Sequence, residues 1–287
     1  MASTQSQRTI VVLGATGNQG SGVVRALLSD QYSDSWLVRA VTQDPSSDKA
    51  QRFLSEYQTP DNRLSLASGN IYNEASLRSA FSGAYGVFAM TNEWLPNKAL
   101  NEEWEFKHEI DAGTNIVSAA KECGVRHFVF SSLPDTVKAS HGQLRRIHHM
   151  NNKHTIEQLA RMKLDGFTSL IPEIFHLGVE KTNGKTYLAL GPKITPEDMT
   201  KVFTLVTGRP AVHSPISFEE FGELCSKFVG PAFKEDASEM MQLAAMAPAD
   251  KTCYGAFELE AERANEELGL KASSFEDWLR RSGWAGP

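Results

Sequence analysis

The sequence lacks several features that would assign it to particular classes of protein. It has only three cysteines, Cys123, Cys225 and Cys253, and their spacing does not match a metal site. No apolar run reaches the roughly 18 residues that a membrane span requires. The opening segment MASTQSQR lacks the apolar core of a signal peptide. We therefore expect free thiols in a reducing compartment and a cytoplasmic location, with the nucleus as the alternative.

The chain also lacks a block of basic residues. Its net charge is −6 at pH 7, which does not favour binding to nucleic-acid phosphates. Three histidines, His148, His149 and His154, lie close together, but their spacing does not bring two of them to one helix face beside a carboxylate. We expect no nucleic-acid, membrane or metal partner.

What the chain does have is an alternation of two apolar patterns. Six short apolar segments are typical of buried strands: Thr9–Leu13, Trp36–Thr42, Arg63–Ala67, Gly86–Thr91, Arg126–Ser131 and Gly166–Ile171. Between them, apolar residues recur every three or four positions, as on one face of a helix, and two of the longer patterns predict helices over Glu102–Cys123 and Leu144–Lys163. Strands that alternate with helices at this spacing predict an α/β fold with a doubly wound parallel sheet, the Rossmann architecture.

This alternation ends near Pro172. Beyond it, a helix is predicted from Thr195, and capping boxes at Ser217–Glu220 and Ser273–Glu276 predict two more. Further predictions are a short strand from Thr186 to Ala189 and helices over 235–246 and 260–268. We expect residues 1–171 to form the sheet domain and residues 172–287 to form a small, mostly helical layer for a substrate or a partner.

The first strand leads directly into the glycine-rich segment Gly14–Gly20, and apolar residues at helical spacing follow it. A strand, a glycine turn and a helix N-terminus form a pyrophosphate site for a dinucleotide. Gly14 permits the tight turn, Gly17 lets the backbone approach the phosphates, and Gly20 lets the helix pack closely on the strand. The free N–H groups and the positive dipole end of the helix then face the anion.

The choice between NAD and NADP is made just after the second strand, where an acidic residue holds a ribose hydroxyl or a nearby arginine binds a 2′-phosphate. This chain has the neutral Gln43 there, with serines and Lys49 at the following helix start. Asp44 favours NAD if it points inward, but it can instead cap the next helix. The residues favour NADP(H), with NAD(H) as the alternative.

Four motifs stand in register along the chain: VVLGATGNQG (Val11–Gly20), VRAVTQDP (Val38–Pro45), GAYGVFAMTNEW (Gly83–Trp94) and GVRHFVFSSLPD (Gly124–Asp135). HMNNKHTIEQL (His149–Leu159) and IPEIF (Ile171–Phe175) follow at the expected distances. The set resembles the NmrA-like family of atypical short-chain dehydrogenases, which includes fungal nitrogen-metabolite regulators, NADP(H)-sensing proteins and reductases related to isoflavone reductase. In that family the segment after the sixth strand is usually longer by roughly fifty residues, as judged from the resemblance alone.

The resemblance implies a set of cofactor contacts, spread over the ends of the strands. The pyrophosphate is held by Gly14, Thr16, Gly17, Asn18, Gln19 and Gly20. The adenosine end is bordered by Gln43, Asn70 and Ile71, with Gln43 in place of a frequent arginine. The ribose and nicotinamide are lined by Met90, Thr91, Asn92, Lys153, Pro172, Ile174 and Phe175.

Typical short-chain dehydrogenases carry a catalytic Tyr and Lys four residues apart on the helix after the fifth strand, so both lie on one helical face. Here Lys153 stands in the lysine place and His149 in the tyrosine place, while Ser131 and Ser132 end the fifth strand. A histidine exchanges protons near pH 7, and the nearby Lys153 cation favours its neutral form. The alternative is that His149 is an ordinary helix residue and that turnover has been lost.

Two functions follow from these residues. The first is an oxidoreductase, monomeric or homodimeric, that reduces a small carbonyl, enone or quinone with NAD(P)H. The second is a non-catalytic redox sensor that binds NAD(P) and regulates transcription through a protein partner.

Overall fold

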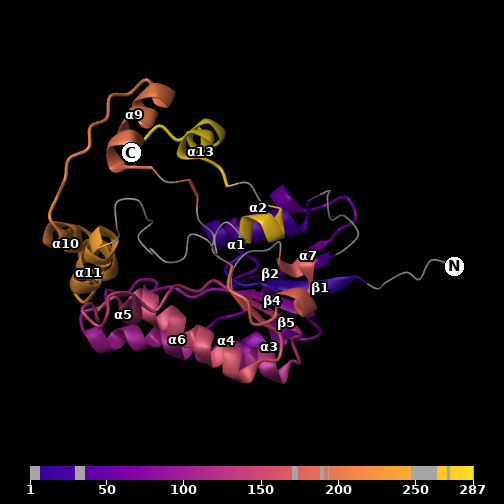
Figure 1. The fold of residues 1–287 in the computed structure, drawn as a ribbon. Coiled ribbons are helices and arrows are strands. Elements are labelled where there is room, and N and C mark those ends of the chain that lie inside the picture. Colours follow the sequence, from indigo (N-terminus) through magenta and orange to yellow (C-terminus); the bar gives the residue numbers. More distant parts are fainter. Residues whose placement is uncertain are drawn as a thin grey trace.

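The computed structural model describes residues 7–29, 36–169, 174–187, 191–192, 194–246, 264–269 and 272–286. At its centre is a parallel sheet in the order β3-β2-β1-β4-β5-β6. Its strands are β1 (Arg8–Val12), β2 (Trp36–Thr42), β3 (Leu64–Ser68), β4 (Gly86–Ala89), β5 (His127–Phe130) and β6 (Phe167–Ser169). Dinucleotide-binding Rossmann sheets have this strand order, so the predicted fold class is confirmed (Figure 1).

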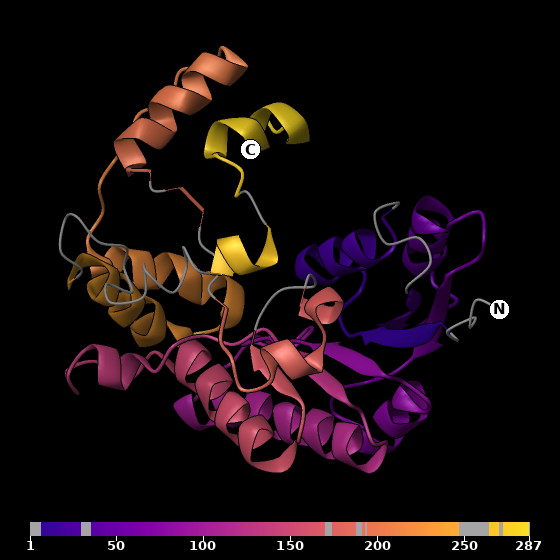
Figure 2. The same ribbon diagram turned by 45° about the vertical axis from the view of Figure 1, so that its right-hand side comes forward.

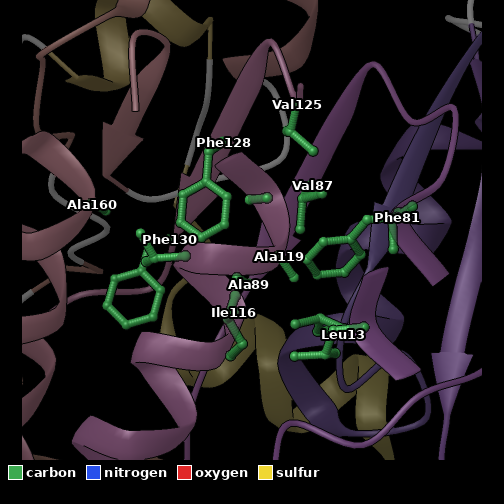
Figure 3. Close-up of a cluster of buried hydrophobic side chains, with 14 of the residues drawn as sticks. Leu13, Phe81, Val87, Ala89, Ile116, Ala119, Val125, Phe128, Phe130 and Ala160 are labelled. Atoms are coloured by element: carbon green, nitrogen blue, oxygen red, sulfur yellow. The ribbon is translucent and has the colours of Figure 1, made fainter. Parts of the chain in front are cut away.

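One face of the sheet packs under three helices. They are α3 (Glu74–Phe81), α4 (Lys107–Glu122) and α6 (His148–Lys163). Alternate strand residues, such as Val11, Val87 and Phe128, point to this side and are buried among the apolar faces of the helices. Figure 3 shows the cluster, with Phe81, Phe128 and Phe130 among its largest side chains.

The other face packs under α1 (Asn18–Leu27) and α2 (Asp48–Tyr57) (Figure 1). Strand residues of the opposite phase, including Ile10, Val12 and Phe88, form this second buried cluster. The central strands β4 and β5 are therefore buried on both sides, as a parallel sheet covered on two faces requires, whereas the edge strand β3 has exposed serines.

The short helices α7 (Ile174–Leu177) and α8 (Val179–Thr182) follow β6 and turn back toward the amino ends of the strands. Phe175 reaches the first residues of two strands, because its ring lies 5.0 Å from that of His127 and a side chain on Gly86 would collide with it. The Thr182 hydroxyl connects α8 to the start of β5 through a hydrogen-bond contact of 3.2 Å with His127 Nε2.

The boundaries of several predicted elements differ in the structure. The predicted helix over 102–123 begins as a 3-10 turn, η2 (Glu103–Phe106), before α4. α6 begins at His148 rather than at residue 144. The last capping box pairs Ser274 with Asp277, one residue later than predicted, because the Ser274 hydroxyl accepts from the Asp277 amide while the Asp277 carboxylate accepts from the Ser274 amide.

In the described residues after 192, the C-terminal layer contains helices joined by irregular segments, as predicted. α10 (Phe218–Val229) and α11 (Phe233–Met246) form an antiparallel hairpin in which Gly222 lies against the Lys234 carbonyl. Leu243 of α11 packs on Ile147 and Met150, beside the start of α6. The hairpin is therefore anchored on the sheet domain near α5 (Thr136–Ala139) and α6 (Figures 1 and 2).

A second helix pair, α9 (Pro196–Thr207) and α13 (Phe275–Ser282), stands away from the sheet (Figures 1 and 2). Its contact is aromatic: the ring of Phe203 lies 5.5 Å from that of Trp284, which in turn lies 5.7 Å from that of Trp278. Residues 188–189 of the predicted strand over 186–189 and residues 260–263 of the predicted helix over 260–268 lie outside the described residues; Thr186 is a bridge residue, and residues 264–268 are helical. Among the helices of the described ranges, none is long and apolar enough to cross a bilayer.

Candidate active site at the carboxyl edge of the sheet

The glycine turn has the conformation that its sequence predicts. Gly14 follows β1 with φ +62°, a left-handed value that favours glycine, and its carbonyl accepts a 2.9 Å hydrogen bond from the Gly17 amide. A Cβ atom on Gly20 would lie 2.2 Å from the Gly14 oxygen. Gly20 is thus the residue at which helix α1 and the β1 turn meet backbone to backbone.

The N-terminus of α1 is suited to an anion. Gly17 is its N-cap and offers no side-chain cap, and the first turn contains no acidic residue. Asn18 and Gln19 are exposed, so the first amides of the helix face outward without a local acceptor from a capping side chain. Met90, after β4, borders the turn, because its sulfur lies 3.1 Å from where a Gly14 Cβ would stand. These residues fit the pyrophosphate of a dinucleotide.

The carboxyl ends of β2 and β3 place the predicted adenosine contacts. Gln43 is exposed just beyond β2. Asp44 is occupied locally, because its Oδ1 accepts from the amide and the hydroxyl of Ser46, and these hydrogen bonds lower its pKa. Ser47, rather than Asp44, is the N-cap of α2. The Asp44 carboxylate, which would favour NAD, therefore points into the loop that contains Ser46.

Asn70 and Ile71 follow β3. The Asn70 side-chain oxygen accepts from the Tyr72 amide at 2.9 Å, which ties the side chain to its own loop and leaves its amide nitrogen as a donor for a ligand. Ile71 packs on the first apolar cluster, and its carbonyl accepts from Asn115. Both residues lie at the predicted edge of the sheet, and the Asn70 side-chain oxygen and the Ile71 carbonyl each accept a hydrogen bond from within the protein.

The segment after β4 contains a buried polar cluster. The hydroxyl of Thr91 donates a 2.7 Å hydrogen bond to Glu109 Oε1, and the Lys153 ammonium donates to the same oxygen. Glu109 is fully buried and Lys153 nearly so. Glu93, in the same loop as Asn92, lies 3.9 Å from the Lys153 ammonium. Lys153 is thereby held beside Met90, Thr91 and Asn92, in the place predicted for a nicotinamide contact.

The two serines after β5 differ in their surroundings. Ser132 is buried, and its hydroxyl donates to the backbone carbonyls of Leu133 at 3.3 Å and Lys153 at 3.4 Å. Ser131 aligns with β4 through its amide, which donates to the Ala89 carbonyl. Within the described residues the Ser131 hydroxyl has no hydrogen-bond partner. A serine hydroxyl at this strand end can orient a substrate carbonyl; both serines stay candidates for that role, and Ser131 has the hydroxyl that the fold does not use.

His149 lies one helical turn before Lys153 on α6 and is largely buried. Its ring nitrogen Nδ1 contacts Asp236 Oδ1, and its backbone amide donates to Asp236 Oδ2 at 2.9 Å. Phe233 packs near the ring, with centroids 5.6 Å apart. His148 faces a different carboxylate, Glu103, at 2.6 Å.

Sequence reasoning missed Glu109 and Asp236, although both gave a signal. Glu109 falls three and four residues before the buried Ala112 and Gly113, and Asp236 falls three residues after the buried Phe233. Each carboxylate therefore occupies the apolar face of its helix, where an acidic residue needs a partner. No spacing in the sequence identifies those partners as Lys153 and His149.

Two predicted residues, Ile174 and Phe175, do not reach this edge. Ile174 and Phe175 are wholly buried in the second apolar cluster, and Phe175 contacts the amino ends of β4 and β5. The prediction that they line the nicotinamide pocket is wrong, because α7 packs at the amino ends of β4 and β5, on the face that α1 and α2 cover. Pro172 lies outside the described residues.

Comparison with known proteins shows the family and the fold of this chain. The model of the NmrA-like family matches residues 6–175, more than half of the chain. This chain belongs to the NmrA-like family. An NmrA-like family domain-containing oxidoreductase of Malbranchea aurantiaca is 33% identical over 172 residues, which are 59% of this chain and 47% of the relative. The chain thus spans about half the length of such curated relatives.

Solved structures share the fold at low sequence identity. NmrA, a negative transcriptional regulator in complex with NADP, superimposes with a TM-score of 0.68 at 16% identity, covering 96% of this chain and 95% of that one. An NADPH-dependent quinone oxidoreductase from Escherichia coli, complexed with NADPH, gives a TM-score of 0.63 at 16% identity, covering 96% and 99%. These likenesses extend the family fold beyond residue 175.

Proposed function

We propose that this chain is an NAD(P)H-dependent oxidoreductase that reduces a small carbonyl, enone or quinone, with NADP(H) preferred and NAD(H) accepted. One observation carries the proposal: the uncapped N-terminus of α1 and the buried Lys153–Glu109 cluster are both bordered by the Met90–Thr91 segment. The oxidoreductase names of curated relatives support it. A reduced nicotinamide bound at this edge supplies a hydride.

The remaining chemistry belongs to side chains of this protein. Backbone amides of residues 17–20 bind the pyrophosphate at the helix N-terminus. Lys153, neutralised by Glu109, offers its remaining N–H donors to a ribose hydroxyl. His149 transfers a proton to the substrate oxygen in place of the missing tyrosine, and Ser131 donates a hydrogen bond that holds this oxygen. NADP(H) is favoured because Gln43 carries no negative charge and Asp44 is engaged by Ser46.

The test begins with the nucleotide that co-purifies with the protein and calorimetric titration with NADPH and NADH. NADPH consumption is then measured over a panel of small aldehydes, enones and quinones. We expect NADPH binding, turnover of at least one class, and a loss of about 100-fold in kcat for His149→Gln. Lack of affinity for every adenine dinucleotide would overturn the proposal.

Binding without turnover would instead favour the non-catalytic redox sensor. In that case, affinity for a protein partner must differ between the oxidised, reduced and cofactor-free protein, because a ligand shifts only an equilibrium whose states it binds unequally. Solved NmrA, a transcriptional regulator, is the structural precedent for this outcome.

A further inference from the structure

Asp236 has surroundings that differ from those of the other acidic residues on α11. Its carboxylate is fully buried, and both oxygens are used by one residue: Oδ2 accepts from the His149 amide at 2.9 Å and Oδ1 contacts His149 Nδ1. Glu235 and Glu239 lie toward the surface and contact Arg146 instead. A buried carboxylate is costly unless it is paired and hydrogen-bonded, so Asp236 is held in one place by His149.

The pair fixes the imidazole as well as the carboxylate. An acceptor at Nδ1 selects the form of the ring that carries hydrogen on Nδ1, which leaves Nε2 as the site of proton exchange. Phe233 restricts the ring from the side, and only 12% of the His149 side chain is exposed. In the described residues, Nε2 has no hydrogen-bond partner, so it is free to meet a ligand.

His149 lies on the same face of α6 as Lys153, which belongs to the candidate site. Residues four apart share a helix face, and Lys153 uses that face to reach Glu109 and Thr91 beyond β4. The other charged groups around the start of α6 have partners of their own: His148 contacts Glu103, and Arg146 lies between Glu103 and Glu235. Asp236 is therefore the carboxylate dedicated to His149.

We propose that Asp236 is a positioning residue, which orients His149 so that its Nε2 gives the proton in the reduction. This inference rests on the proposed function. The substrate carbon accepts the hydride, the C=O π electrons pass to oxygen, and that oxygen takes the proton from the Nε2–H of the imidazolium. The imidazole is left neutral with hydrogen on Nδ1, bonded to Asp236, and water returns the proton to Nε2. Asp236 itself stays ionised throughout.

The first test reads the ring directly and does not depend on turnover. Nitrogen-15 NMR of the full chain distinguishes the two neutral tautomers of His149. We expect the Nδ1-protonated form in the wild type and a mixture, or the Nε2-protonated form, in Asp236→Asn. The matched control is Glu103→Gln, which removes the exposed carboxylate beside His148 and should leave the His149 signals unchanged.

The second test uses kinetics with NADPH and the best substrate of the panel. We expect kcat to fall about 100-fold or more in Asp236→Asn and in His149→Gln, with little further loss in the double variant, because the two residues act as one unit. NADPH affinity and KM should change little, and Glu103→Gln should match the wild type. Circular dichroism confirms folding, and His149→Gln tests the pair independently if Asp236→Asn is unstable.

The outcomes separate this inference from the proposed function. A wild type that binds NADPH but reduces no substrate would overturn the proposed function. A wild type that turns over while Asp236→Asn keeps both its tautomer and its kcat would overturn only the role of Asp236. A loss of kcat in Asp236→Asn without any change of tautomer would also reject positioning, because the residue would then act through stability alone.

Discussion

The ammonium group of Lys153 and the carboxylate of Glu109 meet inside the protein, where the Lys153 side chain is 11% exposed and the Glu109 side chain is not exposed at all. Thr91 donates to the same carboxylate oxygen, while Glu109 Oε2 has no partner among the described residues. Burial makes each charge dependent on the other, because neither can recover its hydration in the folded state. The pair joins α4 to α6 next to the predicted nicotinamide position.

Lys153→Met should therefore lower the free energy of unfolding by about 3–5 kcal/mol, since it leaves the Glu109 carboxylate buried without a counter-charge. The double variant Lys153→Met/Glu109→Gln should recover part of this loss, because no unpaired charge remains and Thr91 keeps an acceptor. Urea denaturation followed by circular dichroism measures both. The matched control is Lys107→Met, which breaks an exposed pair with Asp111 on the same helix and should cost less than about 1 kcal/mol.

The three glycines around the start of α1 should respond differently to alanine. Gly17→Ala should fold with only a small loss in melting temperature, because its φ of −94° suits alanine while its Cβ atom would lie 3.2 Å from the Gly14 oxygen. It should bind NADPH at least tenfold more weakly, because the new methyl group crowds the anion site. Gly20→Ala should unfold more readily, because its methyl group would lie 2.2 Å from the Gly14 oxygen.

Gly22→Ala is the control for that pair. A Cβ atom at Gly22 meets nothing within 4 Å, so the substitution should stabilise α1 by about 0.5–1 kcal/mol and leave NADPH binding unchanged. Calorimetric titration and thermal melts of the three variants give both quantities. Equal NADPH affinity of Gly17→Ala and the wild type would contradict the assigned pyrophosphate position.

His127 should make stability depend on pH. Burial lowers its pKa from 6.5 to about 4, so the folded protein holds it neutral while the unfolded chain protonates it below pH 6.5. The unfolded state then binds more protons, and the free energy of unfolding should fall by about 3 kcal/mol as pH drops from 6.5 to 4. Urea denaturation across this range measures the slope.

His127→Phe should remove the part of that slope that His127 contributes and leave the part that comes from His176, whose pKa burial also lowers to about 4. Phenylalanine fits among Tyr85 and Phe175, and the Thr182 hydroxyl keeps its bond to the Gly178 carbonyl. The control is His141→Asn at an exposed position with φ +52°, where asparagine is tolerated. An unchanged slope in His127→Phe would mean that another group carries the pH dependence.

Gln43→Arg should shift cofactor preference toward NADP(H). Gln43 is exposed beyond β2, and a guanidinium there can bind the 2′-phosphate with charge-assisted hydrogen bonds of about 1.5–3 kcal/mol. The ratio of the dissociation constants for NADH and NADPH should rise by about tenfold or more. Ser55→Arg adds the same charge on an exposed position of α2 and should leave the ratio unaltered; a rise in both variants would indicate general charge attraction.

The sequence predicted those parts of the molecule that depend on neighbours along the chain. Apolar alternation identified the sheet strands, and Gly14 and Gly20 were assigned their roles because a turn and a close helix contact require glycine locally. The partners of His149 and Lys153 could not be predicted, because Asp236 and Glu109 are 87 and 44 residues distant. The predicted position of Phe175 was wrong for the same reason, because its contacts with His127 and Gly86 join residues that are far apart in the sequence.

The turn between α10 and α11 is hydrogen-bonded through its backbone to the loop that follows β4. The Leu100 amide donates to the Val229 carbonyl at 2.9 Å, and the Leu100 carbonyl accepts from Ala232 at 3.1 Å. A fragment ending at residue 175 would therefore strip Leu100 of both backbone partners and uncover the ring of Phe106 that Phe233 shields. The segment that the family model matches ends at residue 175. The loop after β4 within that segment nevertheless depends on Val229, Ala232 and Phe233, which come more than fifty residues later in the chain.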